Sequence, residues 1–314
     1  MQIHRNIDHL PPFRNAVITI GTFDGVHTGH QQILEQLRQA ASRIGGETVI
    51  ITFHPHPRKI VTGSSGGAVR LINTLAEKIE LLSWKKMDHL VVVPFTESFS
   101  QLTAEQYVKD FLLEKFHPHT IIIGYDHQFG KGRKGDYHLL ESFSQSERFD
   151  LQEIPVHLLN AISVSSTRIR EAIGQADMDT ANRLLGYDFF FSGRVMEGNR
   201  LGRTIGYPTA NLLVEDPEKL IPGDGVYAVE IAEGPGELRG SMKGMMNIGK
   251  RPTVDGTKRT IEVNIFDFNE DLYGKELRVF TRKHLRGEQK FSGLDALKAQ
   301  LAKDKENAVA ALTP

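Results

Sequence analysis

Up to about residue 185 the sequence alternates short, almost continuous apolar runs with longer amphipathic stretches. The apolar runs are predicted strands at residues 16–20, 48–53, 89–95 and 120–125. The amphipathic stretches, with leucine and isoleucine at helical spacing, are predicted helices at residues 31–44, 74–87 and 103–116. Strands that are apolar throughout are typical of a parallel sheet covered by helices on both faces. The sequence therefore predicts a doubly wound α/β domain over residues 1–185.

A different pattern follows from about residue 186. Short strand candidates, separated by Gly, Pro, Asn and Asp, occupy residues 189–195, 226–231, 241–248, 260–268 and 276–281. One helix is expected after them, at 292–305, with Leu294, Leu297 and Leu301 on one face. Many short strands with turn residues between them favour a small antiparallel β-barrel. We therefore predict a second domain over residues 186–314, a barrel with a closing helix.

Composition excludes several classes of protein. Two domains are the usual expectation for 314 residues. A formal net charge of −1 argues against nucleic-acid and polybasic membrane partners. The chain has no cysteine, which excludes disulfides, thiolate metal sites and cysteine nucleophiles. No apolar run approaches the roughly 20 residues that span a bilayer, and there is no signal-peptide core, so a cytoplasmic location is expected.

The most informative segment is Gly-Thr-Phe-Asp-Gly-Val-His-Thr-Gly-His at residues 21–30, between a predicted strand and a predicted helix. Its glycines allow close backbone approach, and a helix N-terminus offers free N–H groups to an anion. His27 and His30 lie on one face of the first helical turn and can bind phosphate oxygens. Such a site suits nucleotidyl transfer, which depends on positioning and charge stabilisation. The alternative, that these residues only cap a helix, fits the flanking sequence less well.

Further polar motifs follow other predicted elements of the first domain. Val-Ser-Ser-Thr-Arg-Ile-Arg at 164–170 opens a helix with three hydroxyls and two arginines, which suits phosphate binding. Taken alone, the segment is better explained as a serine cap on an amphipathic helix; together with the histidine motif, it indicates a second phosphate clamp. Residues 52–57 and 124–133 each follow a strand, so both are expected at the same sheet edge as the histidine motif. Either could also be an ordinary loop.

The second domain begins with a loop rich in glycine and arginine over residues 193–211. It is a plausible phosphate cover but not a Walker sequence, because Gly-Lys-Ser/Thr is missing. The loop ends in Pro-Thr-Ala-Asn at 208–211, and the threonine hydroxyl and asparagine amide are oxygen ligands suited to Mg²⁺. A hairpin with solvated arginines is the structural alternative.

Strand parity singles out a carboxylate further along the chain. In residues 260–266 the aliphatic side chains share one face, while Glu262 and Asn264 share the other. A strand glutamate usually faces water. A kinase, however, needs a base near the acceptor hydroxyl, and a carboxylate is the common choice.

Together these motifs resemble the bacterial bifunctional FAD synthetases, in which FMN adenylyltransferase is fused to riboflavin kinase. The resemblance runs from about residue 16 to residue 304, with the modules in the same order, and Pro208–Asn211 followed by Glu262 is its most specific part. Residues 247–253 and 286–291 also match. The resemblance implies a Rossmann-like nucleotidyltransferase domain followed by the riboflavin kinase barrel.

For the kinase module, the resemblance implies ATP-dependent phosphorylation of the ribityl 5′-hydroxyl of riboflavin. Glu262 corresponds to the catalytic base, and Thr209 and Asn211 to the Mg²⁺–nucleotide ligands. The implied ATP- and phosphate-binding residues are Gly202, Arg203, Gly206 and Pro208. The implied flavin-binding residues are Arg286, Glu288 and Phe291. The family often has histidine at the position of Asn264, where it makes a supporting contact.

For the first module, the resemblance implies transfer of AMP from ATP to FMN, with release of pyrophosphate. His27 and His30 correspond to the catalytic phosphate-binding pair. The implied ATP- and phosphate-binding residues are Gly21, Thr22, Phe23, Asp24, Gly25, Gly29, Ser165, Ser166, Thr167 and Arg168. The implied flavin-binding residues are His56, Pro57, Asp126 and Phe129. The family often has Asn at position 22, and Phe-Arg where this chain has His127-Gln128.

The resemblance thus predicts a flavin-cofactor enzyme with the substrates riboflavin, FMN and ATP, with Mg²⁺, and without a tightly bound prosthetic group. It implies no oligomeric state. Two alternatives stay open: only one of the two activities is live, or the chain is a non-catalytic flavin-binding regulator. Intact motifs in both modules favour the bifunctional enzyme, because a pure binder needs neither a base nor two phosphate clamps.

Overall fold

The computed structural model describes residues 1–62, 69–124, 127–154, 164–198, 202, 205–237, 239–253 and 256–313. It forms two compact units. Unit 1 comprises Met1–Val69 and Asn73–Ser165, and unit 2 comprises Arg70–Ile72 and Ser166–Pro314. The domain boundary expected at residues 185/186 stays a prediction.

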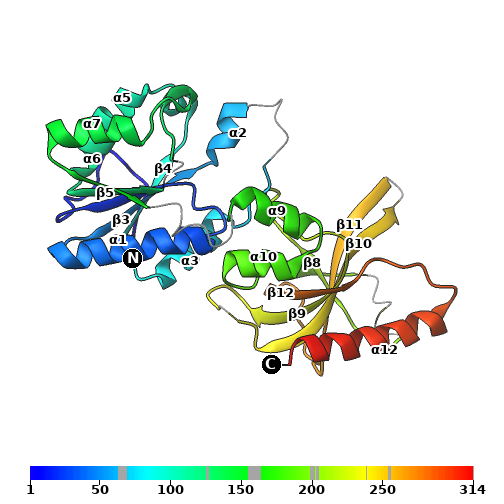
Figure 1. Ribbon diagram of the computed structural model, residues 1–314. Helices are drawn as coiled ribbons and strands as arrows, with labels where there is room; N and C mark the ends of the chain where they lie inside the picture. The colour runs from blue at the N-terminus through cyan, green and yellow to red at the C-terminus, as the bar shows by residue number, and fades with distance from the viewer. Residues whose placement is uncertain are drawn as a thin grey trace. The chain divides into compact units, whose positions relative to one another are not determined.

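Unit 1 is built on a six-stranded parallel sheet with helices around it (Figure 1). Its strands are β1 Gln2–His4, β2 Val17–Ile20, β3 Thr48–His54, β4 His89–Pro94, β5 Thr120–Gly124 and β6 Asp150–Ile154, in the order β1-β4-β3-β2-β5-β6. The longer helices are α1 Thr28–Ile44, α3 Leu75–Trp84 and α7 Tyr137–Glu147. The short helical segments are α2 Pro57–Thr62, α4 Glu97–Ser100, α5 Ala104–Gln106, α6 Glu114–Phe116 and a 3₁₀ turn at Lys131–Arg133. The predicted doubly wound α/β fold is confirmed.

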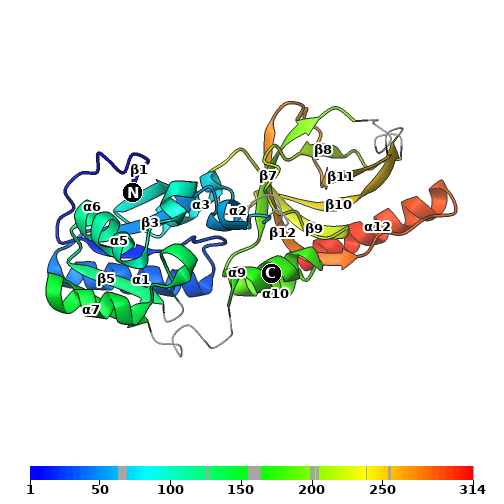
Figure 2. The ribbon, with the colours of Figure 1, turned by 90° about the horizontal axis from the view of Figure 1, so that it is seen from above.

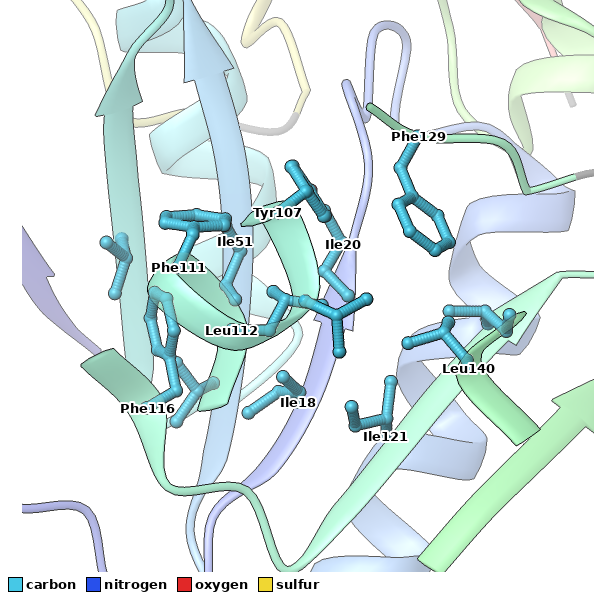
Figure 3. Packing of buried hydrophobic residues seen from close by; sticks show 14 of the residues in the cluster. Ile18, Ile20, Ile51, Tyr107, Phe111, Leu112, Phe116, Ile121, Phe129 and Leu140 are labelled. Carbon is cyan, nitrogen blue, oxygen red and sulfur yellow. The ribbon is translucent and has the colours of Figure 1, made fainter. Parts of the chain in front are cut away.

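The helix predicted over 103–116 is present but changes its winding. Its middle, Tyr107–Leu113, is a π-helix between α5 and α6. Tyr107, Phe111 and Leu112 from this segment are buried against the sheet residues Ile18 and Ile51 (Figure 3). Each such buried side chain contributes about 1.5–3 kcal/mol to stability. Packing of these large rings therefore anchors the segment to one face of the sheet.

The strand order creates a crevice at one edge of the sheet. From β2 the chain proceeds outward through β3 and β4, and it then returns to place β5 and β6 on the other side of β2. The connections that leave β2 and β5 therefore diverge, and ligands of open α/β sheets bind at such a switch point. The histidine motif directly follows β2, so it lies at this crevice.

Unit 2 contains a closed antiparallel barrel with the strand order β10-β11-β8-β7-β12-β9 (Figure 2). Its strands are β7 Phe190–Met196, β8 Ala210–Leu213, β9 Gly225–Glu233, β10 Met242–Thr253, β11 Gly256–Ile265 and β12 Glu276–Arg286. Its helices are α9 Ser166–Gly174, α10 Met178–Leu185 and α12 Leu294–Ala311. The predicted barrel with a closing helix is confirmed. Strand β8 was not predicted, because it is short and lies in the Pro-Thr-Ala-Asn motif.

Helix α12 packs along the outer side of β9 and β10 (Figure 2). Its buried Ala308 and Leu312 contact Ala228 and Met245 of the barrel, and Leu301 joins this cluster. The expectation that Leu294 packs on the barrel is wrong: its side chain is 59% exposed, because only the later turns of the helix cover the strands. No helix in the described part of the chain is long and apolar enough to cross a membrane.

Candidate functional sites

The turn between β2 and α1 has an unusual backbone. Phe23 and Val26 adopt positive φ values of 46° and 36°, and Gly25 has φ 89°. A left-handed conformation costs a non-glycine residue about 1–3 kcal/mol, and it is rare for a β-branched residue such as valine. Strain of this kind persists only where surrounding contacts enforce it, and it is concentrated at functional sites. The surrounding contacts therefore enforce the conformation of this turn, as is typical of a functional site.

Contacts on both sides of Phe23 hold this turn. The Thr22 carbonyl accepts hydrogen bonds from Thr52 Oγ1 at 3.1 Å and from Lys78 Nζ at 2.7 Å. The carboxylate of the buried Asp24 accepts one from the Asn73 backbone N–H at 3.2 Å. Asn73 directly precedes the N-cap of α3, and Lys78 lies within that helix, so the start of α3 supports the turn.

The two histidines stack at the start of α1. His27 is the N-cap, and its Nδ1 accepts a hydrogen bond from the His30 backbone N–H at 3.3 Å. The ring centroids are 3.6 Å apart, with 14° between the planes. Nδ1 of His27 must be unprotonated to accept this bond, which defines the tautomer of the neutral ring. The histidines predicted to share a helical face are thus brought together.

His30 is half-buried, and its imidazole stays neutral at pH 7. Burial, followed by the nearby His27 and Lys78, holds the pKa of His30 well below its usual range. Its buried Nδ1 has no hydrogen-bond partner among the described residues. A neutral imidazole with one unused nitrogen can donate to, or accept from, a bound group. This is the behaviour needed beside a phosphate oxygen.

Glycines permit the close packing of these rings. A Cβ on Gly29 would lie 3.3 Å from His27 Nδ1, and one on Gly21 would lie 3.2 Å from the Phe23 ring. At these distances any other residue would require the neighbouring ring to shift by a few tenths of an ångström. Gly25 is needed for another reason, its positive φ.

The other predicted residues of unit 1 occupy different environments. His56 lies just before α2, where its Nδ1 accepts a hydrogen bond from the Arg58 N–H at 3.2 Å, and Pro57 begins that helix. Phe129 is only 5% exposed and stacks on Tyr107 in the core, so its proposed flavin contact stays a prediction. Asp126 lies outside the described residues.

The position at which the family often has arginine has a local partner. Gln128 Oε1 accepts a hydrogen bond from Arg133 Nε at 2.7 Å. Arg133 also has a positive φ of 58° in the 3₁₀ turn after β5. The hydrogen bond between Gln128 and Arg133 therefore stabilises the turn at Lys131–Arg133.

The predicted second phosphate clamp opens a helix, as expected. Helix α9 begins at Ser166, and Thr167 and Arg168 are exposed in its first turn. Ser165 is the last residue of unit 1, whereas Ser166 to Arg168 belong to unit 2. Their participation in the site of the first module stays a prediction.

Strand register assembles the site of unit 2. Glu262 of β11 lies directly opposite Asn211 of β8 on one side and Asn247 of β10 on the other. Residues that are directly opposite in an antiparallel sheet point to the same face. The half-buried carboxylate of Glu262 is thus flanked by two amides. Sequence spacing did not predict this arrangement, because the three residues belong to different strands.

The next polar residue on this face supports the Pro-Thr-Ala-Asn motif. Asn264 is 7% exposed, and its Nδ2 donates to the Pro208 carbonyl at 2.7 Å. Although the family often has histidine here, the asparagine supplies a donor that fastens the residue before Thr209. Whether this bond replaces the contact that the family's histidine makes is not tested by the structure.

Three glycines make close contact with predicted kinase residues. A Cβ on Gly198 would lie 2.2 Å from Asn211 Nδ2, and one on Gly249 would lie 1.8 Å from Glu288 Oε1. A Cβ on Gly202 would lie 2.2 Å from the Tyr207 carbonyl and 3.5 Å from Thr209 Oγ1. The glycine-rich segments thus leave room for the polar side chains. Arg203 lies outside the described residues, and Gly206 turns the chain with φ 86°.

Arg286 has a protein partner that the sequence did not indicate. Its guanidinium donates to both carboxylate oxygens of Asp304 at 2.6–3.1 Å, and Asp304 is only 1% exposed. The same guanidinium lies 5.7 Å from the centre of the Phe291 ring. Arg286 therefore ties β12 to α12, and its predicted flavin contact stays a prediction. The separation of 18 residues gave no periodic signal for this pair.

These two arrangements define a two-module class of protein, in which a nucleotidyltransferase-like α/β unit precedes an antiparallel barrel. The FAD synthetase family model matches residues 11–168, and the riboflavin kinase model matches residues 185–312. The chain belongs to the family of bifunctional riboflavin kinase/FMN adenylyltransferases, as its motifs predicted.

Curated relatives match almost end to end. The bifunctional riboflavin kinase/FMN adenylyltransferase of Escherichia coli K12 is 37% identical over 97% of this chain and 96% of its own length. That of Listeria monocytogenes is 36% identical over 93% and 91%. A crystal structure titled macrolide-efflux protein from Streptococcus pneumoniae has a TM-score of 0.86 and 31% identity, and the match covers 98% of each chain.

Proposed function

We propose that the chain phosphorylates riboflavin to FMN with ATP in unit 2 and adenylylates FMN to FAD in unit 1, releasing pyrophosphate. One observation carries this proposal: the chain is similar to the bifunctional enzymes along 97% of its length and has both kinds of site. These are a histidine-capped helix at the sheet crevice and a carboxylate flanked by two amides on the barrel. A single-activity enzyme or a flavin-binding regulator needs only one of these sites, or neither.

In the barrel, Glu262 acts as the general base. A half-buried strand carboxylate can take the proton of the ribityl 5′-hydroxyl as the oxygen attacks the γ-phosphorus of ATP. Asn211 and Asn247, in register on either side, keep the base aligned. Glu288 and Phe291 are assigned to the flavin side of this site, and Gly202, Arg203, Gly206 and Pro208 to the phosphate side.

Mg²⁺ fits the residues of this module. The Thr209 hydroxyl and the Asn211 amide are oxygen donors, the ligand type that Mg²⁺ prefers beside substrate phosphates. The close approach of Gly202 and Gly198 to these two residues leaves space that a side chain would fill. Bound there, Mg²⁺ would neutralise charge on the phosphates of ATP.

In unit 1, His27, the neutral His30 and the N-terminus of α1 receive the phosphates of ATP. The turn at 21–25 encloses them, and Ser165 to Arg168 form the second clamp. Transfer needs no covalent protein intermediate: a phosphate oxygen of FMN attacks the α-phosphorus, and pyrophosphate leaves. The protein contributes orientation and hydrogen-bond donors. His56, Pro57, Asp126 and Phe129 are assigned to the flavin side.

A chromatographic time course with riboflavin, ATP and Mg²⁺ tests the whole proposal. We expect FMN to appear first and FAD to follow. FMN that accumulates without FAD, also when FMN itself is supplied, would show that only the kinase is live. No product would favour the flavin-binding regulator.

A further inference from the structure

Lys78 is a buried lysine for which the two assigned reactions have no role. Its side chain extends from α3, and the residue is 6% exposed. Nζ lies 2.7 Å from the Thr22 carbonyl and 3.5 Å from Thr52 Oγ1. Burying an ammonium group is costly unless polar partners compensate it. The polar contacts with Thr22 and Thr52 therefore compensate part of the free-energy cost of burying this ammonium group.

Its partners lie at the point where the strained turn begins. Thr22 immediately precedes Phe23, the first residue with positive φ, and its carbonyl accepts from both Lys78 and Thr52. Beyond Phe23, Asp24 is bound by the backbone of Asn73. The turn is thus fastened on both sides of its first strained residue.

The helix that carries Lys78 is a firm support. Thr74 and Glu77 form a reciprocal capping box at the start of α3, with contacts of 2.9 Å and 3.2 Å. The box satisfies two backbone donors of the first helical turn. A cation that extends from the second turn can therefore define the position of the Thr22 carbonyl.

We propose that Lys78 is a positioning residue for adenylyl transfer, because its buried ammonium group holds the turn that presents His27 and His30 at the start of α1. This inference rests on the proposed function of unit 1. The lysine is assigned no contact with substrate. It acts through the backbone at Thr22.

The pH profile of the unaltered enzyme provides a first test. Burial lowers the pKa of Lys78 to about 8, although the Asp24 carboxylate acts in the opposite direction. The charged lysine is present below that pH and is lost above it, and a neutral amine donates a weaker hydrogen bond. Of the other groups facing it, His30 has a lowered pKa and titrates on the acid side.

We therefore expect kcat/KM for FMN adenylylation to fall several-fold as the pH rises through about 8. Riboflavin phosphorylation by the same chain should not show this decline. An adenylylation profile that stays flat from about pH 7 to 9.5 would overturn the inference.

The variant Lys78→Met tests the same contact directly. We expect kcat/KM for adenylylation to fall about 100-fold, the effect of misplacing a reacting group by roughly 1 Å. The residual activity should lack the alkaline decline, and the kinase rate should be unchanged. Lys115→Met is the matched control: Lys115 lies on α6 of the same unit, and its Nζ donates to Asp8 Oδ1 at 3.3 Å rather than to the turn.

Because Lys78→Met also removes the cation that faces Asp24, Thr52→Val provides a second variant. It removes the other donor to Thr22 with little change in volume and should lower adenylylation about tenfold. If both variants keep full adenylylation activity, the inference about Lys78 is wrong, while the proposed function of unit 1 still stands. If the unaltered enzyme does not convert FMN to FAD, the proposed function fails, and the inference fails with it.

Discussion

The two candidate sites are built in opposite ways. In unit 1 the functional residues are neighbours in sequence, on one turn and the first turn of α1, and buried polar groups beneath the turn hold them. In unit 2 they come from β8, β10, β11 and the segment after β12, and strand register and glycine contacts assemble them. A compact motif tolerates little backbone change, whereas a dispersed site depends on the whole barrel.

Removing the base should have the largest effect and should separate the two sites. We expect Glu262→Gln to reduce riboflavin phosphorylation by about 10²–10⁴-fold, because the amide cannot accept the proton. FMN-to-FAD conversion should be unchanged. The exposed strand glutamate changed in Glu276→Gln is the control. Equal loss of both steps would contradict the two-site model.

The reverse experiment changes His30, the half-buried histidine of unit 1. His30→Ala should reduce adenylylation by about 10²–10³-fold, the cost of one preorganised donor at a charged centre. The kinase rate measured on the same sample reports that the chain is folded. His138→Ala, at a side chain that is 86% exposed on α7, should change neither rate. If His30→Ala still forms FAD at the normal rate, His30 does not have the phosphate-binding role assigned to it.

The dependence of the second site on the whole barrel can be tested at α12. Asp304→Ala leaves the Arg286 guanidinium without its buried partner and should destabilise unit 2 by about 3 kcal/mol. Urea unfolding measures this, and Glu306→Ala, at an exposed position of the same helix, should have little effect. Adenylylation in dilute urea should persist after phosphorylation is lost. A variant as stable as the unaltered chain would show that the pair does not fasten α12.

The smallest expected effect concerns one glycine contact. Gly249→Ala places a methyl group where Glu288 Oε1 lies, at 1.8 Å, so the flexible carboxylate must move. We expect KM for riboflavin to rise about tenfold, roughly the contribution of one hydrogen bond. At Gly287 an added Cβ meets nothing within 4 Å, which makes Gly287→Ala the control. An unchanged KM would remove Glu288 from the flavin site.

Most of the fold could be predicted because its signals are periodic. The apolar runs that became β2, β3, β4 and β5 and the amphipathic helix α1 were recognisable from spacing alone. The three-residue β1, the largely exposed β6 and the four-residue β8 were not predicted, because short or polar edge strands carry little pattern. The π-helix at Tyr107–Leu113 follows from how large rings pack, which spacing does not encode.

By itself the sequence determined the two modules, their order and the residues of the histidine and Pro-Thr-Ala-Asn motifs, because these depend on neighbouring positions. Only the tertiary structure decided that Lys78 supports the strained turn, that Glu262 lies between Asn211 and Asn247, and that Arg286 is paired with Asp304. Each of these contacts joins residues 15 to 56 positions apart. Local spacing cannot encode them, because strand register and the path of the chain bring such residues together.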